Sequence, residues 1–136
     1  MARSLTERQW YTLLQFRVAL RRFLHWSDKQ AASVGLTSAQ HQLLVAIRGH
    51  GGGGAPTITD VAQSLMVRHH SAIGLVERAQ ALGLVERHAD QADQRRVRLA
   101  LTPLGHERVN ALAAAHLEEI RRLAPLLESL ATVSEE

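Results

Sequence analysis

The stretch from Leu84 to Gly105, LVERHADQADQRRVRLALTPLG, decides the fold of this chain. Two short segments in which apolar and polar residues alternate, Leu84–His88 and Val97–Leu101, flank the polar loop Ala89–Arg96. Alternation with a period of two on both sides of a polar loop predicts a β-hairpin. The loop holds two aspartates and two adjacent arginines, so its tip is too strongly charged to be packed inside the protein. We therefore expect the tip to contact something outside the chain.

Two short helical patterns lie immediately upstream of this hairpin. The first has Val61, Ala62 and Leu65 on one face, with Thr59 as its expected N-cap and an end near Met66. The second runs from about Arg68 to Leu82 and stops at Gly83, with an inward face formed by Ala72, Ile73, Val76 and Ala79. Two such helices joined by a tight turn predict a helix-turn-helix, and a basic hairpin after it is typical of proteins that read DNA.

Further helices are predicted on both sides of this central region. The first begins at a capping box, Ser4–Leu5–Thr6–Glu7, and runs to about Val34 before Gly35. The second begins at the capping box Thr37–Gln40 and ends near Arg48. The last begins at Thr102–Pro103, and Pro125 is expected to kink it or to restart it.

Four consecutive glycines, Gly51–Gly54, lie between the second and third predicted helices. A phosphate-binding loop needs Lys-Ser or Lys-Thr directly after its last glycine and a strand before the loop, and neither is present. The glycines therefore indicate a flexible connector.

The first helix is apolar on several faces, which indicates that another subunit covers it. Its large apolar residues include Trp10, Leu13, Leu14, Phe16 and Leu20. A monomer of 136 residues cannot easily cover a helix of this kind, whereas a dimer can. We expect the partner surface to include Leu117, Ile120, Leu123 and Leu127 of the last helix.

Length and composition limit the number of domains and the possible partners and location of the chain. The 136 residues are expected to form a single domain, since there is no repeat and no sign of a second domain. The net charge is only +3, so affinity for nucleic acid would have to come from clustered arginines. The absence of cysteine excludes disulfides and thiolate zinc sites, and no apolar run is long enough to span a membrane. A cytoplasmic location is the default expectation.

The residues Arg68–His69–His70–Ser71 open the second helix of the helix-turn-helix, where side chains reach base edges in the major groove. The alternative at this point is a solvated, charged helix start. In the hairpin, the guanidinium of Arg95 is expected to enter a narrow minor groove of DNA, because the negative potential in such a groove attracts a positive charge. Asp93 is expected to brace an arginine and not to touch DNA; the alternative is a surface salt bridge worth under about 1 kcal/mol.

Four stretches together, LTSAQHQLLVAIRG, TITDVAQSLMV, SAIGLVERAQALGLVER and DQADQRRVRLALTPLG, resemble the MarR (multiple-antibiotic-resistance regulator) family of winged helix-turn-helix repressors. The similarity extends over nearly the whole chain. Its specific part is Asp93–Gln94–Arg95 followed by Leu101–Thr102–x–x–Gly105, since many winged-helix families share the helix-turn-helix alone.

The resemblance implies a mainly α fold with a small β-hairpin wing, in a MarR-like homodimer. Residues 1–35 and 102–136 would form the dimerisation helices, and residues 36–101 the DNA-binding lobe, with the wing at 84–101. The recognition helix Arg68–Leu82 would enter the major groove and Arg95 the minor groove. Two departures from the family stand out: position 74 is Gly where many members carry a polar or basic residue, and Arg68 stands where a small hydroxyl residue often caps the helix. The full set of expected DNA contacts is Thr59, Arg68, His69, His70, Ser71, Arg78, Arg95 and Arg96, with Asp93 bracing the wing.

The function predicted in this way is a sequence-specific regulator of transcription, a repressor released by a small-molecule effector, acting on a pseudo-palindromic site in double-stranded DNA. Family members typically bind an aromatic or phenolic effector between the dimerisation helices and the DNA-binding lobe. Trp26, His41 and His106 are the candidates for lining that site here. An effector changes DNA affinity only if it binds one arrangement of the lobes better than another.

Three other function classes fit the sequence less well. A metal-responsive regulator would need clustered histidines; adjacent His69 and His70 diverge on a helix, His106 has poor spacing to other ligands, and His25, His41 and His116 would have to meet in space. Neither a metal nor another cofactor is expected. A DNA-coating protein would bind any duplex, whereas a regulator prefers its own site. An enzyme is disfavoured because no cysteine nucleophile, Gly-x-Ser-x-Gly elbow, His-Glu-x-x-His motif or dinucleotide fingerprint is present.

Overall fold

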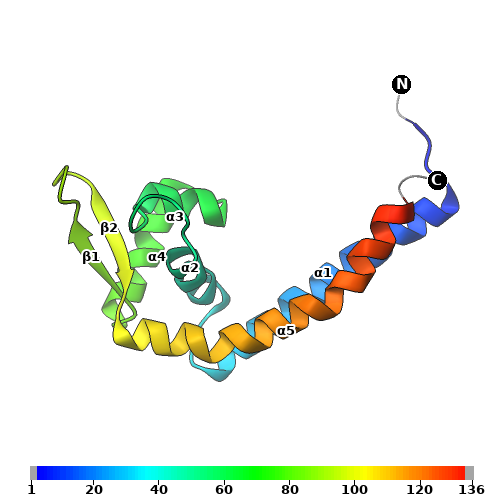
Figure 1. The fold of residues 1–136 in the computed structure, drawn as a ribbon. Coiled ribbons are helices and arrows are strands. Elements are labelled where there is room, and N and C mark those ends of the chain that lie inside the picture. The colour runs from blue at the N-terminus through cyan, green and yellow to red at the C-terminus, as the bar shows by residue number, and fades with distance from the viewer. Residues whose placement is uncertain (1–2, 134–136) are drawn as a thin grey trace. The chain divides into compact units, whose positions relative to one another are not determined.

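The computed structural model describes residues 3–133, which form five helices and one hairpin. This is the architecture that the sequence predicts. No helix in this part of the chain combines the length and apolar character needed to cross a membrane. The elements in chain order are α1 (Glu7–Ser33), α2 (Ser38–Arg48), α3 (Ile58–Leu65), α4 (His69–Ala81), β1 (Val85–Ala89), β2 (Val97–Leu101) and α5 (Pro103–Val133) (Figure 1).

The chain divides into two compact units. One comprises residues up to Gln30 together with those from Ala113 onward, and therefore holds most of α1 and the C-terminal part of α5. The other, Ala31–Leu112, holds α2, α3, α4, the hairpin and the start of α5. We refer to them as the helical unit and the winged unit.

The core of the winged unit lies where α2, α3 and α4 pack against one another and against the hairpin. Its fully buried side chains come from each of these elements, so no single helix carries the core. The largest of them are Leu43, Leu44, Val61, Val76, Val85 and Leu99. Burying aliphatic side chains of this size stabilises the fold by about 1.5–3 kcal/mol each.

The hairpin is antiparallel, with Val85 paired to Leu101 and Ala89 to Val97. The chain after the glycine connector extends this sheet, because the Leu99 amide donates to the Pro56 carbonyl at 2.8 Å and Thr57 forms a bridge with Arg98. The entry to α3 is therefore fixed by β2. The first strand begins one residue later than expected, since the Leu84 amide instead donates to the Ala79 carbonyl at the end of α4.

Of the predicted helix caps, those at Thr37 and Thr102 are confirmed and those at Ser4 and Thr59 are wrong. The capping box at Thr37 and Gln40 is present as predicted. The box expected at Ser4 is wrong: α1 begins at Glu7, and Thr6 exchanges hydrogen bonds with Gln9. The N-cap expected at Thr59 is also wrong, because Thr57 and Asp60 form the box that opens α3. In both cases a second hydroxyl residue two positions away had its own partner three residues on, which satisfies two backbone amides at once.

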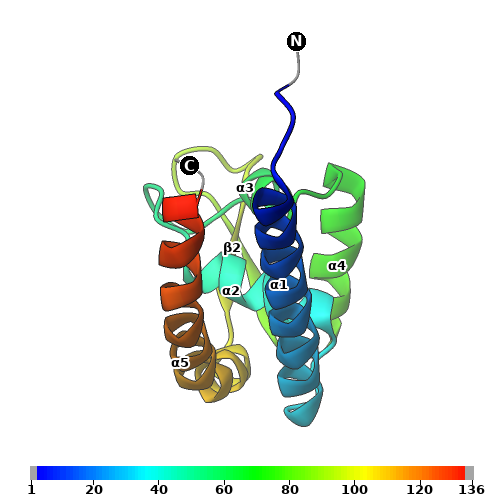
Figure 2. The same ribbon diagram turned by 90° about the vertical axis from the view of Figure 1, so that its right-hand side faces the viewer.

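The start of α5 explains the Leu-Thr-x-x-Gly part of the sequence. Thr102 caps the helix by accepting from the Gly105 amide at 3.0 Å, and its own amide donates to the Leu84 carbonyl at 3.1 Å. A Cβ atom on Gly105 would lie 2.1 Å from the Leu84 carbonyl oxygen, so only glycine fits there. The predicted restart at Pro125 is wrong, because α5 continues through it to Val133 as one ribbon (Figure 2).

The helical unit exposes many large apolar side chains in the single chain. The Trp26 ring packs against the His116 ring at a tilt of 52°, with ring centroids 4.7 Å apart, and the His116 Nε2 atom lies 2.8 Å from the Ser27 hydroxyl, so these contacts join α1 to α5. Outside this small cluster, much of the apolar surface has no cover. The exposed residues are Trp10, Tyr11, Leu13, Leu14, Phe16, Leu20, Leu24, Leu117, Ile120 and Leu127.

Candidate nucleic-acid interface

The turn between α3 and α4 sets the direction of the second helix. Met66 ends α3 in the left-handed conformation (φ 55°), and its amide donates back to α3. Arg68 is the N-cap of α4, yet its side chain makes no capping hydrogen bond and is free to extend outward. Arg68 therefore occupies the N-cap position of α4, but its side chain does not cap the helix.

One face of α4 is buried and the other is open to solvent. The buried residues are Ala72, Leu75, Val76 and Ala79; Leu75 takes the inward place expected for Ile73, which is half-buried. The residues at the N-terminal end of the helix are all exposed: Arg68, His69, His70 and Ser71. A helix packed on one side with an exposed polar N-terminal end can enter a DNA groove without unpacking its core.

Gly74 and Arg78 form a local unit on the exposed side of α4. A Cβ atom on Gly74 would lie 3.3 Å from Nη1 of Arg78, so the guanidinium lies directly over the glycine. Helical side chains point toward the N-terminus, which explains how a residue four positions later covers this site. Arg78 therefore places a guanidinium over position 74, a contact that sequence reasoning did not find.

The tip of the hairpin carries Arg95 with its side chain 91% exposed. Asp93 Oδ1 accepts from Arg95 Nε at 3.2 Å and from the Arg95 amide at 3.1 Å. The side-chain bond from Arg95, followed by its backbone bond, lowers the pKa of the Asp93 carboxyl. These bonds order the tip while leaving the guanidinium accessible, and Arg96 beside it is also exposed. Thr59, the remaining expected contact apart from Arg78, is exposed in the first turn of α3.

A second arginine, Arg98, ties the wing to the entry of α3, and sequence reasoning missed it. Its Nη1 donates to the Ala55 carbonyl at 2.6 Å, and its Nη2 lies 3.4 Å from Asp90 Oδ2. The two side chains of this ion pair are only 23% and 15% exposed. The signal in the sequence was an arginine at an outward-facing position of a short strand, which says nothing about its partner 43 residues earlier.

Asp60 couples the same region to a histidine. The Thr57 amide donates to its carboxylate at 2.9 Å, and His50 Nε2 lies 3.7 Å from the same oxygen. The backbone hydrogen bond from Thr57 lowers the pKa of the Asp60 carboxyl, and the charges of His50 and Arg98 add to that effect. Asp60 is therefore held ionised at the N-terminus of α3, where a negative charge is favoured.

Arg87 on β1 is the one arginine in the described residues whose buried donors lack acceptors. It is paired with Leu99, so its side chain shares the inner face of the hairpin. Its Nε and Nη2 atoms are buried without a hydrogen-bond partner. The aliphatic part of the Arg87 side chain packs, while its guanidinium loses hydration without gaining hydrogen bonds at these atoms. Burying Arg87 therefore lowers the stability of the fold locally.

The family model for MarR proteins matches residues 34–96, which span α2, the helix-turn-helix, β1 and the loop of the hairpin. Residues 34–96 belong to the MarR family. This confirms the resemblance read from the sequence, and the predicted function class, a DNA-binding regulator of transcription, is confirmed with it. MarR-family regulators are generally DNA-binding proteins and not enzymes.

Solved MarR-family structures share the fold over nearly the whole chain. The MarR-family regulator AbsC of Streptomyces coelicolor is 23% identical, with a TM-score of 0.75 over 98% of this chain and 97% of that one. A MepR–DNA complex of S. aureus is 20% identical, with a TM-score of 0.71 over 97% and 96%. The BpsR protein of Bordetella bronchiseptica, whose DNA binding is described as regulated by 6-hydroxynicotinic acid, is 26% identical, with a TM-score of 0.56 over 88% and 75%. No curated protein matches this chain significantly in sequence.

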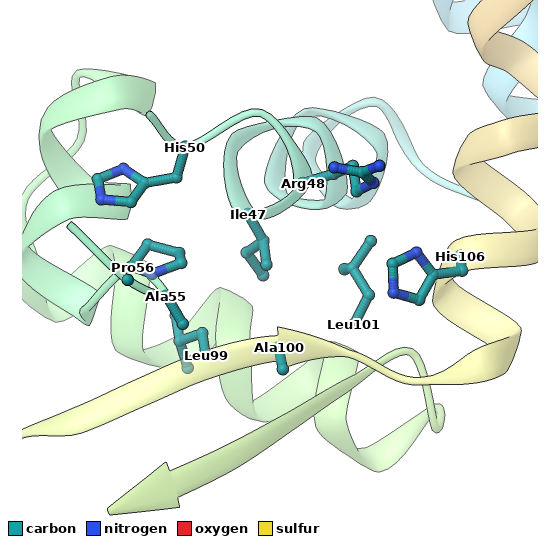
Figure 3. Close-up of a pocket in the computed structure, with 10 residues that line it drawn as sticks. Ile47, Arg48, His50, Ala55, Pro56, Leu99, Ala100, Leu101 and His106 are labelled. Carbon is teal, nitrogen blue, oxygen red and sulfur yellow. The ribbon is translucent and has the colours of Figure 1, made fainter. Parts of the chain in front are cut away.

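The three residues expected to line an effector site of a MarR-family protein have different surroundings. Trp26 belongs to the helical unit and packs on His116. His41 is buried in α2, with only 7% of its surface exposed. His106, in the first turns of α5, lines a cleft of about 220 Å³ in the winged unit, together with Ile47, Arg48, His50, Gly54, Ala55, Pro56, Leu99, Ala100 and Leu101 (Figure 3).

Histidines do not gather into a metal site in the described part of the chain. Between residues 3 and 133 no three His, Asp or Glu side chains come close enough together to hold a metal ion. His50 is engaged with Asp60, and His116 lies against Ser27. The metal-responsive alternative is therefore not favoured.

Proposed function

We propose that this chain is a homodimeric repressor that binds a pseudo-palindromic DNA site through α4 and the wing and is released by a small-molecule effector. The observation that carries the proposal is that Arg68–Ser71 and Arg95 are exposed on elements packed into one compact unit. An exposed helix end and an exposed arginine tip on one rigid body suit simultaneous contact with a major groove and the adjacent minor groove.

Dimerisation is supported by the uncovered apolar surface of the helical unit. Ten large apolar residues of α1 and α5 are at least 38% exposed in the single chain, from Phe16 at 38% to Tyr11 at 65%. Monomeric proteins rarely expose so many large apolar side chains on two helices, and obligate dimers bury them. Sedimentation at micromolar concentration should give a species of about 30 kDa, twice the 15.0 kDa of one chain; a stable, folded monomer would refute this part.

A dimer with two α4 helices implies a DNA site with twofold symmetry. Half-sites about one helical turn apart would place both recognition helices on the same side of the duplex. If the dimer makes 6–10 phosphate contacts, its affinity should fall by roughly 10³–10⁵ between 50 and 200 mM salt. Equal affinity for random duplex and for a site selected from random sequences would favour a DNA-coating protein instead.

The proposed release of the protein from DNA by an effector is supported by comparison with similar proteins. The regulation described for BpsR supports it, since that protein shares the fold. Direct support would be a small molecule that lowers the affinity for operator DNA while leaving the dimer intact. The direction of regulation would follow from transcription measured with and without the protein on a template carrying the selected site.

The docking arrangement is tested by two arginine variants that should fail differently. Arg95→Ala should weaken binding to all related sites by a similar factor, because a minor groove is read mainly through its width and its content of A·T pairs. Arg68→Ala should relax the preference at one position in each half-site, since a guanine contact is worth about 1–3 kcal/mol.

Arg121→Ala is the matched control, because Arg121 is an exposed arginine of the helical unit with only a surface ion pair. Selection of bound sequences from random duplexes reads out preference and affinity together. If Arg68→Ala lowers affinity uniformly, Arg68 contacts phosphate and not a base. If both variants bind like the parent protein, the docking arrangement is wrong.

A further inference from the structure

The turn between α3 and α4 exposes two neighbouring apolar side chains, Met66 and Val67, which we call the apolar turn. Met66 is 92% exposed, more than any other large hydrophobic residue in the part of the chain that the structure describes, and Val67 is also exposed. Both residues belong to the winged unit. Their exposure is therefore separate from the apolar surface of the helical unit, which dimerisation is proposed to cover.

Met66 also has an unfavourable backbone conformation. Among residues 3–133 it is the only residue other than glycine with a positive φ, which is 55°. A side chain with a Cβ atom destabilises this left-handed conformation, whereas glycine and asparagine tolerate it better. The Met66 side chain gains almost no burial in return. The fold by itself therefore does not favour methionine at this position, and residues in such conformations are concentrated at functional sites.

The backbone of the apolar turn is nevertheless ordered. The Met66 amide donates to the Gln63 carbonyl at 3.2 Å, and the Val67 amide donates to the Ala62 carbonyl at 3.0 Å. Leu65, the residue before the turn, packs against the core. The two apolar side chains therefore extend from a fixed backbone, which limits the conformational entropy that is lost when they bind a partner.

The apolar turn leads directly into the helix end that is proposed to contact DNA. Arg68, the N-cap of α4, follows Val67, and the Cα atoms of Met66 and Arg68 are at most about 8 Å apart because two peptide units separate them. The major groove is about 12 Å wide, so a helix that brings Arg68 to a base edge brings Met66 to the same groove. No aspartate or glutamate lies between Asp60 and Glu77 in the sequence, so this segment carries no charge that phosphates would repel.

The partner of Met66 follows from the chemistry of the groove. The apolar group that base pairs present there is the 5-methyl group of thymine. A thioether side chain is flexible and polarisable, and it adapts well to small apolar groups. We propose that Met66 contacts the 5-methyl group of one thymine in each half-site, beside the base that Arg68 reads. This inference rests on the proposed function, to which it adds a residue that determines sequence preference.

The test compares thymine with deoxyuridine, which lacks only the 5-methyl group and keeps the same base-pairing hydrogen bonds. Each thymine in one half-site of a duplex selected by the full-length parent protein is replaced in turn. At one position the replacement should lower the affinity of the parent about fourfold, the value expected for one buried methyl group. The same replacement should change the affinity of Met66→Gly less than twofold, because that variant has no side chain to contact the methyl group.

The variants Met66→Gly and Met66→Asn separate binding from folding. Both new residues tolerate a left-handed backbone, so the midpoint of urea unfolding should not fall. The affinity for the selected duplex should fall about tenfold in both, because the apolar contact is lost. A residue with only a structural role would lose stability and affinity together.

Leu82→Ala is the matched control, because Leu82 is an exposed apolar residue at the opposite end of α4. This variant should keep the affinity of the parent protein and its response to deoxyuridine.

Three outcomes would overturn the assignment of Met66. The first is an equal response of the parent protein and Met66→Gly to deoxyuridine at every position, even if the variant binds more weakly overall. The second is an unchanged affinity in both Met66 variants, and the third is a lower unfolding midpoint in both. Failure of the proposed function is read from the parent protein alone, since it would then bind no selected duplex more tightly than random duplex.

Discussion

Replacing Arg98 with alanine should destabilise the winged unit although the residue lies on a short two-stranded sheet. Arg98 bonds the Ala55 carbonyl at 2.6 Å and Asp90 at 3.4 Å, so it joins the connector, β2 and the loop of the wing. Both members of the ion pair are largely shielded, at 23% and 15% exposure. The variant loses both interactions at once.

The magnitude follows from the two contacts. A hydrogen bond that involves a charged group contributes about 1.5–3 kcal/mol, and the short contact to the Ala55 carbonyl belongs to this class. The longer pair with Asp90 adds roughly 0.5–1 kcal/mol after discounting for its partial exposure. We therefore expect the free energy of unfolding to fall by about 2–4 kcal/mol.

Urea unfolding monitored by circular dichroism at a single protein concentration measures this loss, since the stability of a dimer depends on concentration. Arg96→Ala is the control: it removes an exposed neighbouring arginine and should change stability by less than about 0.5 kcal/mol. A double-mutant cycle with Asp90→Ala should isolate a coupling of about 0.5–1 kcal/mol between the two charged side chains. Equal unfolding midpoints for Arg98→Ala and Arg96→Ala would refute the role of Arg98 as a tie between wing and connector.

Three further tests, which use five substitutions, examine the fold locally. Thr57→Ala should lower the free energy of unfolding by about 1 kcal/mol through loss of the α3 cap, whereas Thr59→Ala, two residues on, should leave the denaturant midpoint within error. Gly74→Ala should raise the melting temperature because alanine favours a helix by about 1 kcal/mol over glycine. Gly105→Ala should lower the melting temperature sharply or prevent folding, because the new Cβ would overlap the Leu84 carbonyl oxygen. Similar melting temperatures for the two variants would contradict the packing at both sites. In the folded state Asp60 has a pKa below its ordinary value of 3.8. The stability that it contributes is therefore present above about pH 4 and is lost as the pH falls through the folded pKa. The difference in unfolding free energy between the parent protein and Asp60→Asn should accordingly shrink between pH 6 and pH 3.

The elements of the fold could be predicted because their signals are local. Alternation in Val97–Leu101 and the turn-forming Gly83 lie within the elements they define, and the structure has a strand and a helix end there. The errors at Ser4 and Thr59 arose where two hydroxyl residues compete for one helix start. At α3 the choice is made by the residue three positions later, because Asp60 completes a box with Thr57 and no equivalent partner serves Thr59. At α1 both candidates have such a partner, Glu7 for Ser4 and Gln9 for Thr6, and the structure contains the pair Thr6–Gln9.

The candidate site could be predicted only in part, because its geometry depends on contacts between distant positions. The exposed start of α4 and the exposed Arg95 follow from local patterns of apolar residues. The bond from Arg98 to Ala55 spans 43 residues, and neither residue type nor spacing signals it. The cleft likewise brings together His50 and His106 from opposite sides of the hairpin sequence. Packing of the core, and not any motif, places these groups.

The short segment Ala55–Thr57 joins the glycine connector, β2 and the start of α3, and its position is set by hydrogen bonds to these neighbours. Four glycines precede it, so chain stiffness contributes little, and Arg98, Leu99 and Asp60 hold it by hydrogen bonds. Breaking the neutral bond from Leu99 costs roughly 0.5–1.5 kcal/mol, and breaking a bond that involves the charged Arg98 or Asp60 costs about 1.5–3 kcal/mol. Because both lobes of a dimer would bind DNA together, a loss of about 1.4 kcal/mol in each lobe would lower operator affinity about a hundredfold. The loss of one hydrogen bond of this segment in each lobe would therefore be enough to weaken operator binding about a hundredfold.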